Sequence, residues 1–239
     1  MGKTAGIIVI GDEILSGKFA DENAPFLIAE LRALGVDLRR IAVIPDDRAE
    51  IGATATDFAA RFDHVFTSGG VGPTHDDVTM ESIAAAFGVP VVVEPRLEKV
   101  LRDYWGAGMA PANIRLAHVP AGCELVGDDA IWPVVRFKNI HILPGVPALF
   151  RRKFLSIREL FRGRPVVERR VYCSGEEGAL APHINTVVAE FPSCKLGSYP
   201  RFEETRFRVM ITIEAADEPT ADAAAARLRI LVGDLLVEL

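Results

Sequence analysis

The fold of this chain depends on a glycine-rich stretch from Thr67 to Thr79, with the sequence TSGGVGPTHDDVT. Residues 64–67 before the glycines are apolar and β-rich, which predicts a buried strand. Residues 78–87 after them carry spaced apolar side chains without Pro or Gly, which predicts a helix. Gly69, Gly70 and Gly72 can adopt backbone angles closed to other residues and let a ligand approach the main chain. A glycine-rich turn that leads into a helix N-terminus presents unpaired N–H groups, so it suits a phosphate.

The same stretch carries two adjacent carboxylates, Asp76 and Asp77. They would repel a bare phosphate. We therefore expect either a divalent metal between acid and phosphate or a proton-transfer role for one aspartate. The alternative is a tight strand-to-helix turn in which an aspartate caps the helix. The two acids and two threonines favour a ligand-binding loop over that alternative.

The composition is that of an ordinary globular protein, with 239 residues, 49% hydrophobic and 25% charged. The net charge of −6 without a long basic run gives no electrostatic case for nucleic acid. No segment approaches the roughly 20 apolar residues of a membrane helix, so no membrane partner is expected. Cys123, Cys173 and Cys194 match no zinc spacing, which predicts reduced thiols and a cytoplasmic protein.

Strand and helix patterns alternate along the first 87 residues. Strands are predicted at about 7–10, 37–43 and 64–67. Helices are predicted at 22–34, after Pro45-Asp46-Asp47 with Ile51, Ala55, Phe58 and Phe62 on the apolar face, and at 78–87. Further along, a fourth strand is predicted at 89–93, and a short hairpin within 113–135 has a turn signal at 127–129. This order predicts an α/β fold with three layers, α/β/α, and a mostly parallel sheet. Ligands in such sheets bind beyond the carboxyl ends of the strands. The loops predicted there are 11–17, 45–47 and 69–77, and a fourth, Pro144-Gly145-Val146-Pro147, follows a buried strand at 139–143.

A second domain is expected after the linker Gly163-Arg164-Pro165. Its predicted order is a strand at 166–173, a helix at 178–191, strands at 195–199 and 205–214, and a helix at 220–237. This suits a small α+β domain. The predicted domains are therefore 1–163, which binds the ligand, and 164–239.

The motifs resemble those of the molybdenum-cofactor biosynthesis (MoaB/Mog-like) superfamily of molybdopterin-binding domains. They are the glycine stretch with Gly-Pro-Thr-His-Asp-Asp, the later Leu143-Pro144-Gly145-Val146-Pro147, and Gly11-Asp12-Glu13-Ile14-Leu15-Ser16-Gly17 with Asn23 after it. They look closer to one branch, the N-terminal region of competence/damage-inducible protein A, which is also similar to the N-terminal domain of eukaryotic FAD synthase. The tail resembles that branch's small KH-like domain. The deamidase domain of the full-length proteins is expected to be absent, and with it nicotinamide-nucleotide deamidation.

The resemblance implies roles for individual residues. Asp77 matches the aspartate tied to catalysis in adenylyl-transferring members, and Asp46 matches a second aspartate of the same pocket. Asp76 and Asp77 are the predicted ligands of Mg²⁺ or a similar cation. The predicted substrate-binding residues are Gly11, Asp12, Glu13, Ser68, Gly69, Gly70, Gly72, Thr74, Pro144, Gly145 and Pro147.

Two functions remain open at this point. The first is a metal-binding hydrolase, such as a pyrophosphatase, or an adenylyl transferase, acting on ADP-ribose, FAD or adenylyl-molybdopterin. The second is a module that binds molybdopterin or a nucleotide without transforming it. The family resemblance also implies a homo-oligomer, either a dimer or a trimer. The tail lacks a Gly-x-x-Gly loop with basic flanks, which argues against RNA.

Overall fold

The computed structural model describes residues 2–127, 132–164 and 166–239. The chain divides into two compact units, Met1–Gly163 and Arg164–Leu239. Each unit has its own hydrophobic core, because no core cluster shares residues between them. Of the predicted hairpin turn at 127–129, residues 128 and 129 lie outside the described residues.

A six-stranded sheet forms the centre of the first unit, in the order β2-β1-β3-β8-β7-β6. Its strands are β1 (Thr4–Ile10), β2 (Asp37–Ile44), β3 (His64–Ser68), β6 (Glu124–Val126), β7 (Val134–Phe137) and β8 (Ile140–Leu143). The first four in sheet order run parallel, and β7 and β6 form an antiparallel hairpin beside them. The predicted mostly parallel sheet is confirmed.

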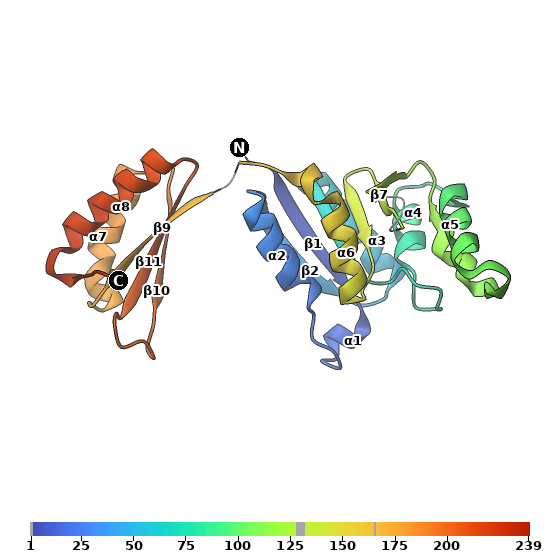
Figure 1. Ribbon diagram of the computed structural model, residues 1–239, viewed down its shortest axis with the longest axis horizontal. Coiled ribbons are helices and arrows are strands. Elements are labelled where there is room, and N and C mark those ends of the chain that lie inside the picture. Colours follow the sequence, from blue (N-terminus) through green and yellow to red (C-terminus); the bar gives the residue numbers. More distant parts are fainter. Residues whose placement is uncertain (1, 128–131, 165) are drawn as a thin grey trace. The chain divides into compact units, whose positions relative to one another are not determined.

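Helices cover both faces of this sheet (Figure 1). On one face lie α2 (Asn23–Ala33) and α6 (Pro147–Ile157), and on the other α3 (Arg48–Arg61) and α4 (Thr79–Ala86). Strand β1 serves both cores, because successive side chains point to opposite faces: Ile8 packs in one core cluster and Ile7 in the other. The predicted α/β class is therefore confirmed.

Two predicted segments of the first unit differ in detail. The expected strand at 89–93 is only β4 (Val91–Val93), which pairs with β5 (His118–Pro120) in a separate two-stranded sheet. Between them lie α5 (Pro95–Trp105) and the 3-10 turns η1 (Gly106–Gly108) and η2 (Pro111–Ala117). The expected loop at 11–17 contains the short helix α1 (Asp12–Leu15).

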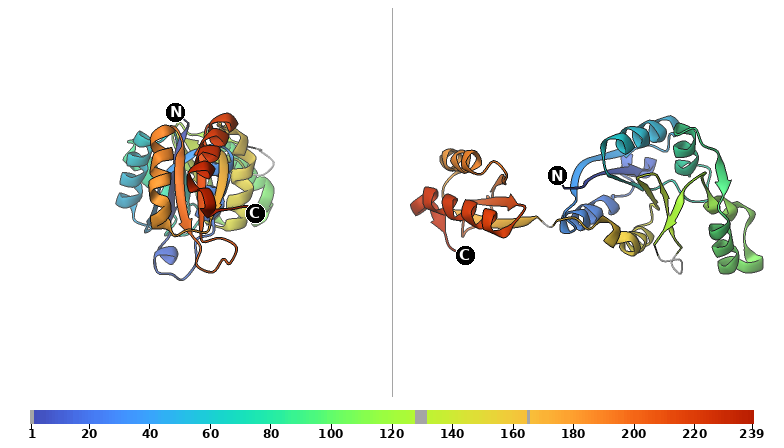
Figure 2. Two further views of the ribbon diagram at one scale, coloured as in Figure 1. Left: turned by 90° about the vertical axis from the view of Figure 1, so that its left-hand side faces the viewer. Right: turned by 90° about the horizontal axis from the view of Figure 1, so that it is seen from above.

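The second unit is an antiparallel sheet in the order β10-β11-β9-β12, with two helices on one face (Figure 2). Its elements are β9 (Val167–Cys173), α7 (Glu177–Glu190), β10 (Lys195–Pro200), β11 (Val209–Ala215), α8 (Glu218–Val232) and β12 (Leu236–Val237). The predicted helix at 220–237 ends earlier, since Gly233 takes a φ of +50° and the next residues pair with β9.

Candidate functional site

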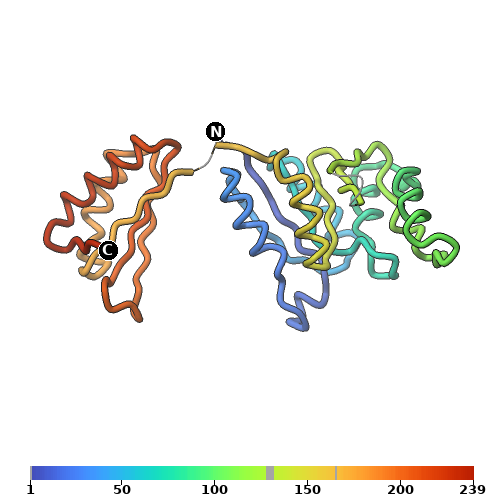
Figure 3. The backbone as a smooth tube through the Cα atoms, viewed as in Figure 1, coloured from blue at the N-terminus to red at the C-terminus, as the bar shows by residue number. Residues whose placement is uncertain are grey.

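The loops that follow the parallel strands gather at one end of the sheet (Figure 3). The amide of Gly11, after β1, donates to the carbonyl of Ile44 at the end of β2, at 3.1 Å. The amide of Asp12 donates to a carboxylate oxygen of Asp46, also at 3.1 Å. The first two predicted loops therefore meet, as expected for the carboxyl ends of neighbouring parallel strands.

The glycine loop after β3 contacts the proline-glycine loop after β8. The amide of Gly69 donates to the carbonyl of Leu143 at 3.2 Å. A Cβ atom added to Gly145 would lie 3.4 Å from the Gly69 Cα. Gly69 has a φ of +112°, and a Cβ atom there would lie 2.1 Å from the Ile10 carbonyl oxygen. No larger residue fits this position, because the chain crosses the end of β1 in contact with it.

The glycine loop closes onto the start of α4 and leaves its own amides open. The Thr79 amide donates to the Gly70 carbonyl, and the Thr79 hydroxyl to the Gly69 carbonyl, each at 3.0 Å. Within the described residues, no protein acceptor bonds the amides of Gly70, Val71 and Gly72. Open amides ahead of a helix N-terminus can bind an anion.

Asp77 lies folded against this loop. One of its carboxylate oxygens accepts from the Thr74 amide at 2.8 Å and from the Thr74 hydroxyl at 2.5 Å. A Cβ atom on Gly72 would lie 2.4 Å from the same oxygen, so a larger residue there would displace the Asp77 carboxylate. Asp76 and His75 are solvent-exposed, with 3.8 Å between the imidazole Nδ1 and the Asp76 carboxylate. The two aspartates therefore differ, since Asp77 is held in place and Asp76 faces water.

The carboxylates of Asp12, Glu13 and Asp76, from two other loops, lie close enough to affect the pKa of Asp46. Partial burial raises the pKa of Asp46, and the negative charges of Glu13, Asp12 and Asp76 raise it further. The bond from the Asp12 amide opposes this rise. A carboxyl with a raised pKa is suited to proton transfer, and crowded carboxylates are stabilised by a cation.

The donor set fits a hard cation only in part. Across the described part of the chain, no group of three or more His, Cys, Asp or Glu side chains forms a metal-binding arrangement. Mg²⁺, however, commonly uses one or two carboxylates together with water and substrate phosphates. Asp46, Asp76 and Asp77 supply oxygen donors of that kind, but a cation would need the oxygens of a bound phosphate in addition to one or two of these carboxylates.

Asn23 is a buried residue that joins three parts of the site. Its side-chain amide donates to the Ser68 hydroxyl at 2.9 Å and to the Gly145 carbonyl at 2.7 Å. Its Oδ1 atom is buried and has no hydrogen-bond partner among the described residues. The Ser68 hydroxyl, predicted to bind substrate, is therefore buried against Asn23. Asn23 belongs to the motif that follows Gly11–Gly17, but its bonding partners are 45 and 122 residues away and could not be predicted from that motif.

Arg115, on η2, also contacts the site, and no pattern in the sequence predicted it. Its guanidinium donates to the carbonyls of Pro73, Thr74 and Asp77. No motif surrounds it in the sequence, since it is an isolated basic residue in an irregular segment. Only the tertiary structure brings it to the glycine loop.

The remaining predicted residues lie on the same loops. Glu13 lies against Gly11, where an added Cβ atom would be 2.6 Å from its carboxylate. Pro144 is half-buried and Pro147 is the first residue of α6, where a proline suits the first helical turn. The amide and the hydroxyl of Thr74 both donate to the Asp77 carboxylate.

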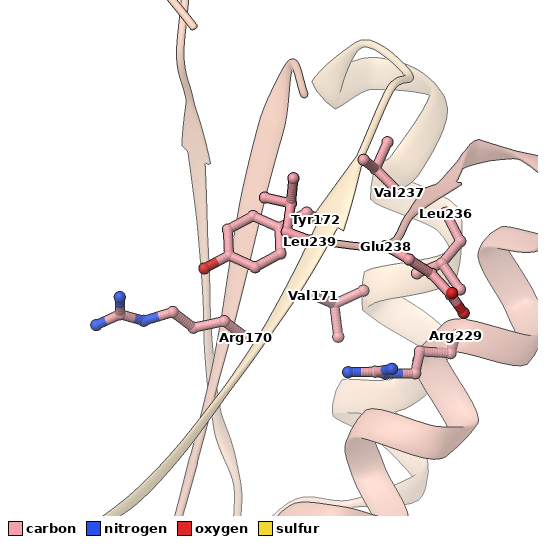
Figure 4. Close-up of a pocket in the computed structure, with 8 residues that line it drawn as sticks. All are labelled: Arg170, Val171, Tyr172, Arg229, Leu236, Val237, Glu238 and Leu239. Atoms are coloured by element: carbon pink, nitrogen blue, oxygen red, sulfur yellow. The ribbon is translucent and has the colours of Figure 1, made fainter. Parts of the chain in front are cut away.

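Two hollows in the second unit contain none of the predicted residues. One, of about 220 Å³, lies between β9, β12 and α8, with Arg170, Tyr172 and Arg229 in its wall (Figure 4). The other, of about 800 Å³, is an open groove along the loop between β10 and β11.

Comparisons with known proteins cover both units. Residues 6–162 match the family described as "Probable molybdopterin binding domain", and residues 165–237 match "FAD synthase, middle domain". A "Probable FAD synthase" of Caenorhabditis elegans is 33% identical over 98% of this chain and 51% of its own length. The chain thus spans about half the length of that relative.

Two further relatives cover about two thirds of this chain. A "CinA-like protein" of Anaeromyxobacter sp. (strain K) is 39% identical over 61% of this chain and 38% of its own length. The crystal structure of CinA from Thermoplasma acidophilum, described as having unknown function, superposes with a TM-score of 0.60 at 29% identity. It covers 66% of this chain and 98% of the other. None of the described helices is long and apolar enough to cross a membrane. Because the family match covers more than half of the sequence, the chain belongs to the molybdopterin-binding, MoaB/Mog-like domain family, as its motifs indicated.

Proposed function

We propose that this protein is a metal-assisted enzyme that acts on a pyrophosphate-linked nucleotide such as ADP-ribose, FAD or adenylyl-molybdopterin. The observation that carries the proposal is that one loop contains both the amides that can bind a phosphate and the carboxylate that can accept a proton. Its open amides at Gly70, Val71 and Gly72 can bind phosphate oxygens, and Asp77 lies fixed beside them. The similarity to proteins named FAD synthase supports a nucleotide ligand.

The proposed reaction is hydrolysis or adenylyl transfer at the pyrophosphate. In hydrolysis, a new P–O bond forms between the water oxygen and one phosphorus while the bridging P–O bond breaks, and two monophosphates result. The loop amides neutralise the non-bridging oxygens, where negative charge gathers. Asp77 or Asp46 accepts the proton of the attacking water. A divalent cation, held by Asp76 and Asp77 with the substrate phosphates, would supply further charge neutralisation.

The alternative is a module that binds molybdopterin or a nucleotide without transforming it. One observation favours it, namely that no cluster of three metal-binding side chains is found within the described residues. The crowding of Asp12, Glu13, Asp46 and Asp76 favours the enzyme, because a pure anion binder gains nothing from adjacent carboxylates. Self-association as a dimer or trimer remains a prediction.

The deciding experiment measures turnover of ADP-ribose, of FAD, and of ATP with molybdopterin, each with and without Mg²⁺. Wild type is compared with Asp77→Asn and with a control, Asp103→Asn, which alters an exposed carboxylate paired with Lys99 on α5. We expect metal-dependent product, lowered about 10²–10⁴-fold in Asp77→Asn with an unchanged melting temperature. Full activity of Asp77→Asn would overturn the assignment of that residue. Ligand binding without product from wild type would establish the binding module instead.

A further inference from the structure

Arg115 bonds the glycine loop at several points with one side chain. One guanidinium nitrogen donates to the Pro73 carbonyl at 3.3 Å and to the Thr74 carbonyl. The other donates to the Asp77 carbonyl at 3.0 Å and to the Glu81 carboxylate at 3.2 Å. The planar, five-donor fork of arginine suits several acceptors at once, which a lysine ammonium does not reproduce.

These bonds set the direction of the loop's peptide groups. In a trans peptide unit the N–H points opposite to the C=O, and the described chain has no cis peptide bond. Because Arg115 holds the carbonyls of Pro73, Thr74 and Asp77, the amides of Thr74, His75 and Val78 point away from the guanidinium. The Thr74 amide then meets the Asp77 carboxylate at 2.8 Å. Arg115 thus orients the backbone group that fixes the proposed catalytic carboxylate.

Arg115 also places a positive charge next to a loop that contains Asp76 and Asp77. Its side chain is 27% exposed and that of Glu81 is 24% exposed, so their ion pair is screened less than a fully exposed pair. The arginine comes from η2, about 40 residues after the loop in sequence. Arg115 therefore supports the loop from a segment outside it, in addition to the bond from the Asp77 amide to the Thr74 carbonyl at 3.3 Å.

We propose that Arg115 is a positioning residue of the active site, which acts by holding residues 73–77 in the geometry that fixes Asp77. Both terminal nitrogens of Arg115 donate to loop carbonyls and Glu81, so the proposed role acts through the loop. The competing explanation is a purely structural tie between η2 and α4. The proposal rests on the proposed function for its kinetic part, whereas its effect on loop order is independent of any activity.

The test compares Arg115→Ala and Arg115→Lys with Arg102→Ala. Arg102 is the matched control, because it makes an exposed ion pair with Glu98 on the neighbouring α5. The first readout is amide hydrogen exchange of the peptide covering residues 69–78, measured without ligand. We expect exchange about tenfold faster or more in Arg115→Ala, with β3 unchanged. Arg102→Ala should exchange as wild type does.

The second readout is kinetic, on whichever substrate of the panel wild type turns over. We expect kcat of Arg115→Ala to fall about 10²-fold with a smaller change in KM, as misplacement of a catalytic group by about 1 Å produces. Added guanidinium at low millimolar concentration should restore at least a tenth of the lost rate. A structural tie would not respond in this way, because a freely diffusing cation cannot rejoin two elements. Arg115→Lys should retain partial activity.

The outcomes separate the two proposals. Wild-type exchange and wild-type kinetics in Arg115→Ala would overturn the role of Arg115 while leaving the proposed function intact. Faster loop exchange in Arg115→Ala, when wild type turns over no substrate, would support the loop-holding role while the enzyme proposal fails. If Arg115→Ala does not fold, Glu81→Gln provides the same test. It weakens the ion pair that orients the Arg115 guanidinium and leaves the arginine side chain in place. Unchanged loop exchange and kcat in Glu81→Gln and in a folded Arg115→Lys would then overturn the role.

Discussion

Gly69 has a φ of +112° and no room for a side chain, since an added Cβ atom would lie 2.1 Å from the Ile10 carbonyl oxygen. Gly88 also has a positive φ, of +67°, but an added Cβ atom there meets nothing within 4 Å. A side chain at either position would strain the backbone, because both glycines have a positive φ. Only at Gly69, in the candidate site, would a side chain also clash with neighbouring main chain.

We expect Gly69→Ala to destabilise the first unit by about 3 kcal/mol or more, because strain and a clash with main chain add together. Gly88→Ala should cost only about 1 kcal/mol. Urea unfolding of both variants measures the difference. Equal effects would show that the loop moves away from β1 to accept the methyl group.

At the scale of elements, the neighbouring strands β3 and β8 bring the rings of His64 and His141 to within 6.0 Å of each other. His141 is 2% exposed and stacks on Phe66 at a ring distance of 5.2 Å, and its Nδ1 has no hydrogen-bond partner. Burial lowers the pKa of His141 to about 3, with the neighbouring His64 and Arg136 acting in the same direction. Burial also lowers the pKa of His64. The packed sheet therefore holds His141 in its neutral form.

Stability should consequently depend on pH through this pair of strands. The unfolded chain binds a proton at His141 near pH 6.5 and the folded chain only near pH 3, so stability falls as the pH drops between those values. His141 alone should cost about 2 kcal/mol by pH 5 and about 3 kcal/mol by pH 4. We expect His141→Leu to flatten that part of the profile, and exposed His75→Gln to leave it unchanged. Denaturant melts from pH 7 to 4 measure this, and parallel profiles for wild type and His141→Leu would refute it.

At the scale of the whole molecule, the two units have separate cores and separate sheets. A unit that buries its own apolar side chains is expected to fold alone. Residues 1–163 expressed alone should thus unfold cooperatively, with the urea midpoint that the first unit shows in the full chain. Circular dichroism with tryptophan fluorescence follows this, because both tryptophans, Trp105 and Trp132, lie in the first unit. A molten or insoluble fragment would show that the first unit needs the second.

Sequence periodicity alone predicted the α/β class and the parallel strands, because alternation of buried strands and amphipathic helices is a local property of the chain. The glycine motif was also readable, since Gly69 and Gly70 need backbone angles that few other residues adopt. The limits of short elements were not readable. The segment predicted as a strand at 89–93 forms β4, which lies outside the main sheet. The helix predicted to reach residue 237 ends at Val232. Pairing partners and tertiary contacts decide such short segments.

What only the tertiary structure decided is how polar side chains from distant segments meet. Asn23 bonds Ser68 and Gly145, and Arg115 bonds the loop that holds Asp77. No motif marks Arg115, and the motif that includes Asn23 does not show what its side chain bonds. Hydrogen bonds between distant segments follow the packing of elements and leave no period in the sequence. Periodicity and glycine spacing thus predicted the loops that meet at one end of the sheet. The packing of the sheet and of the η2 segment determined which side chains hold those loops in place.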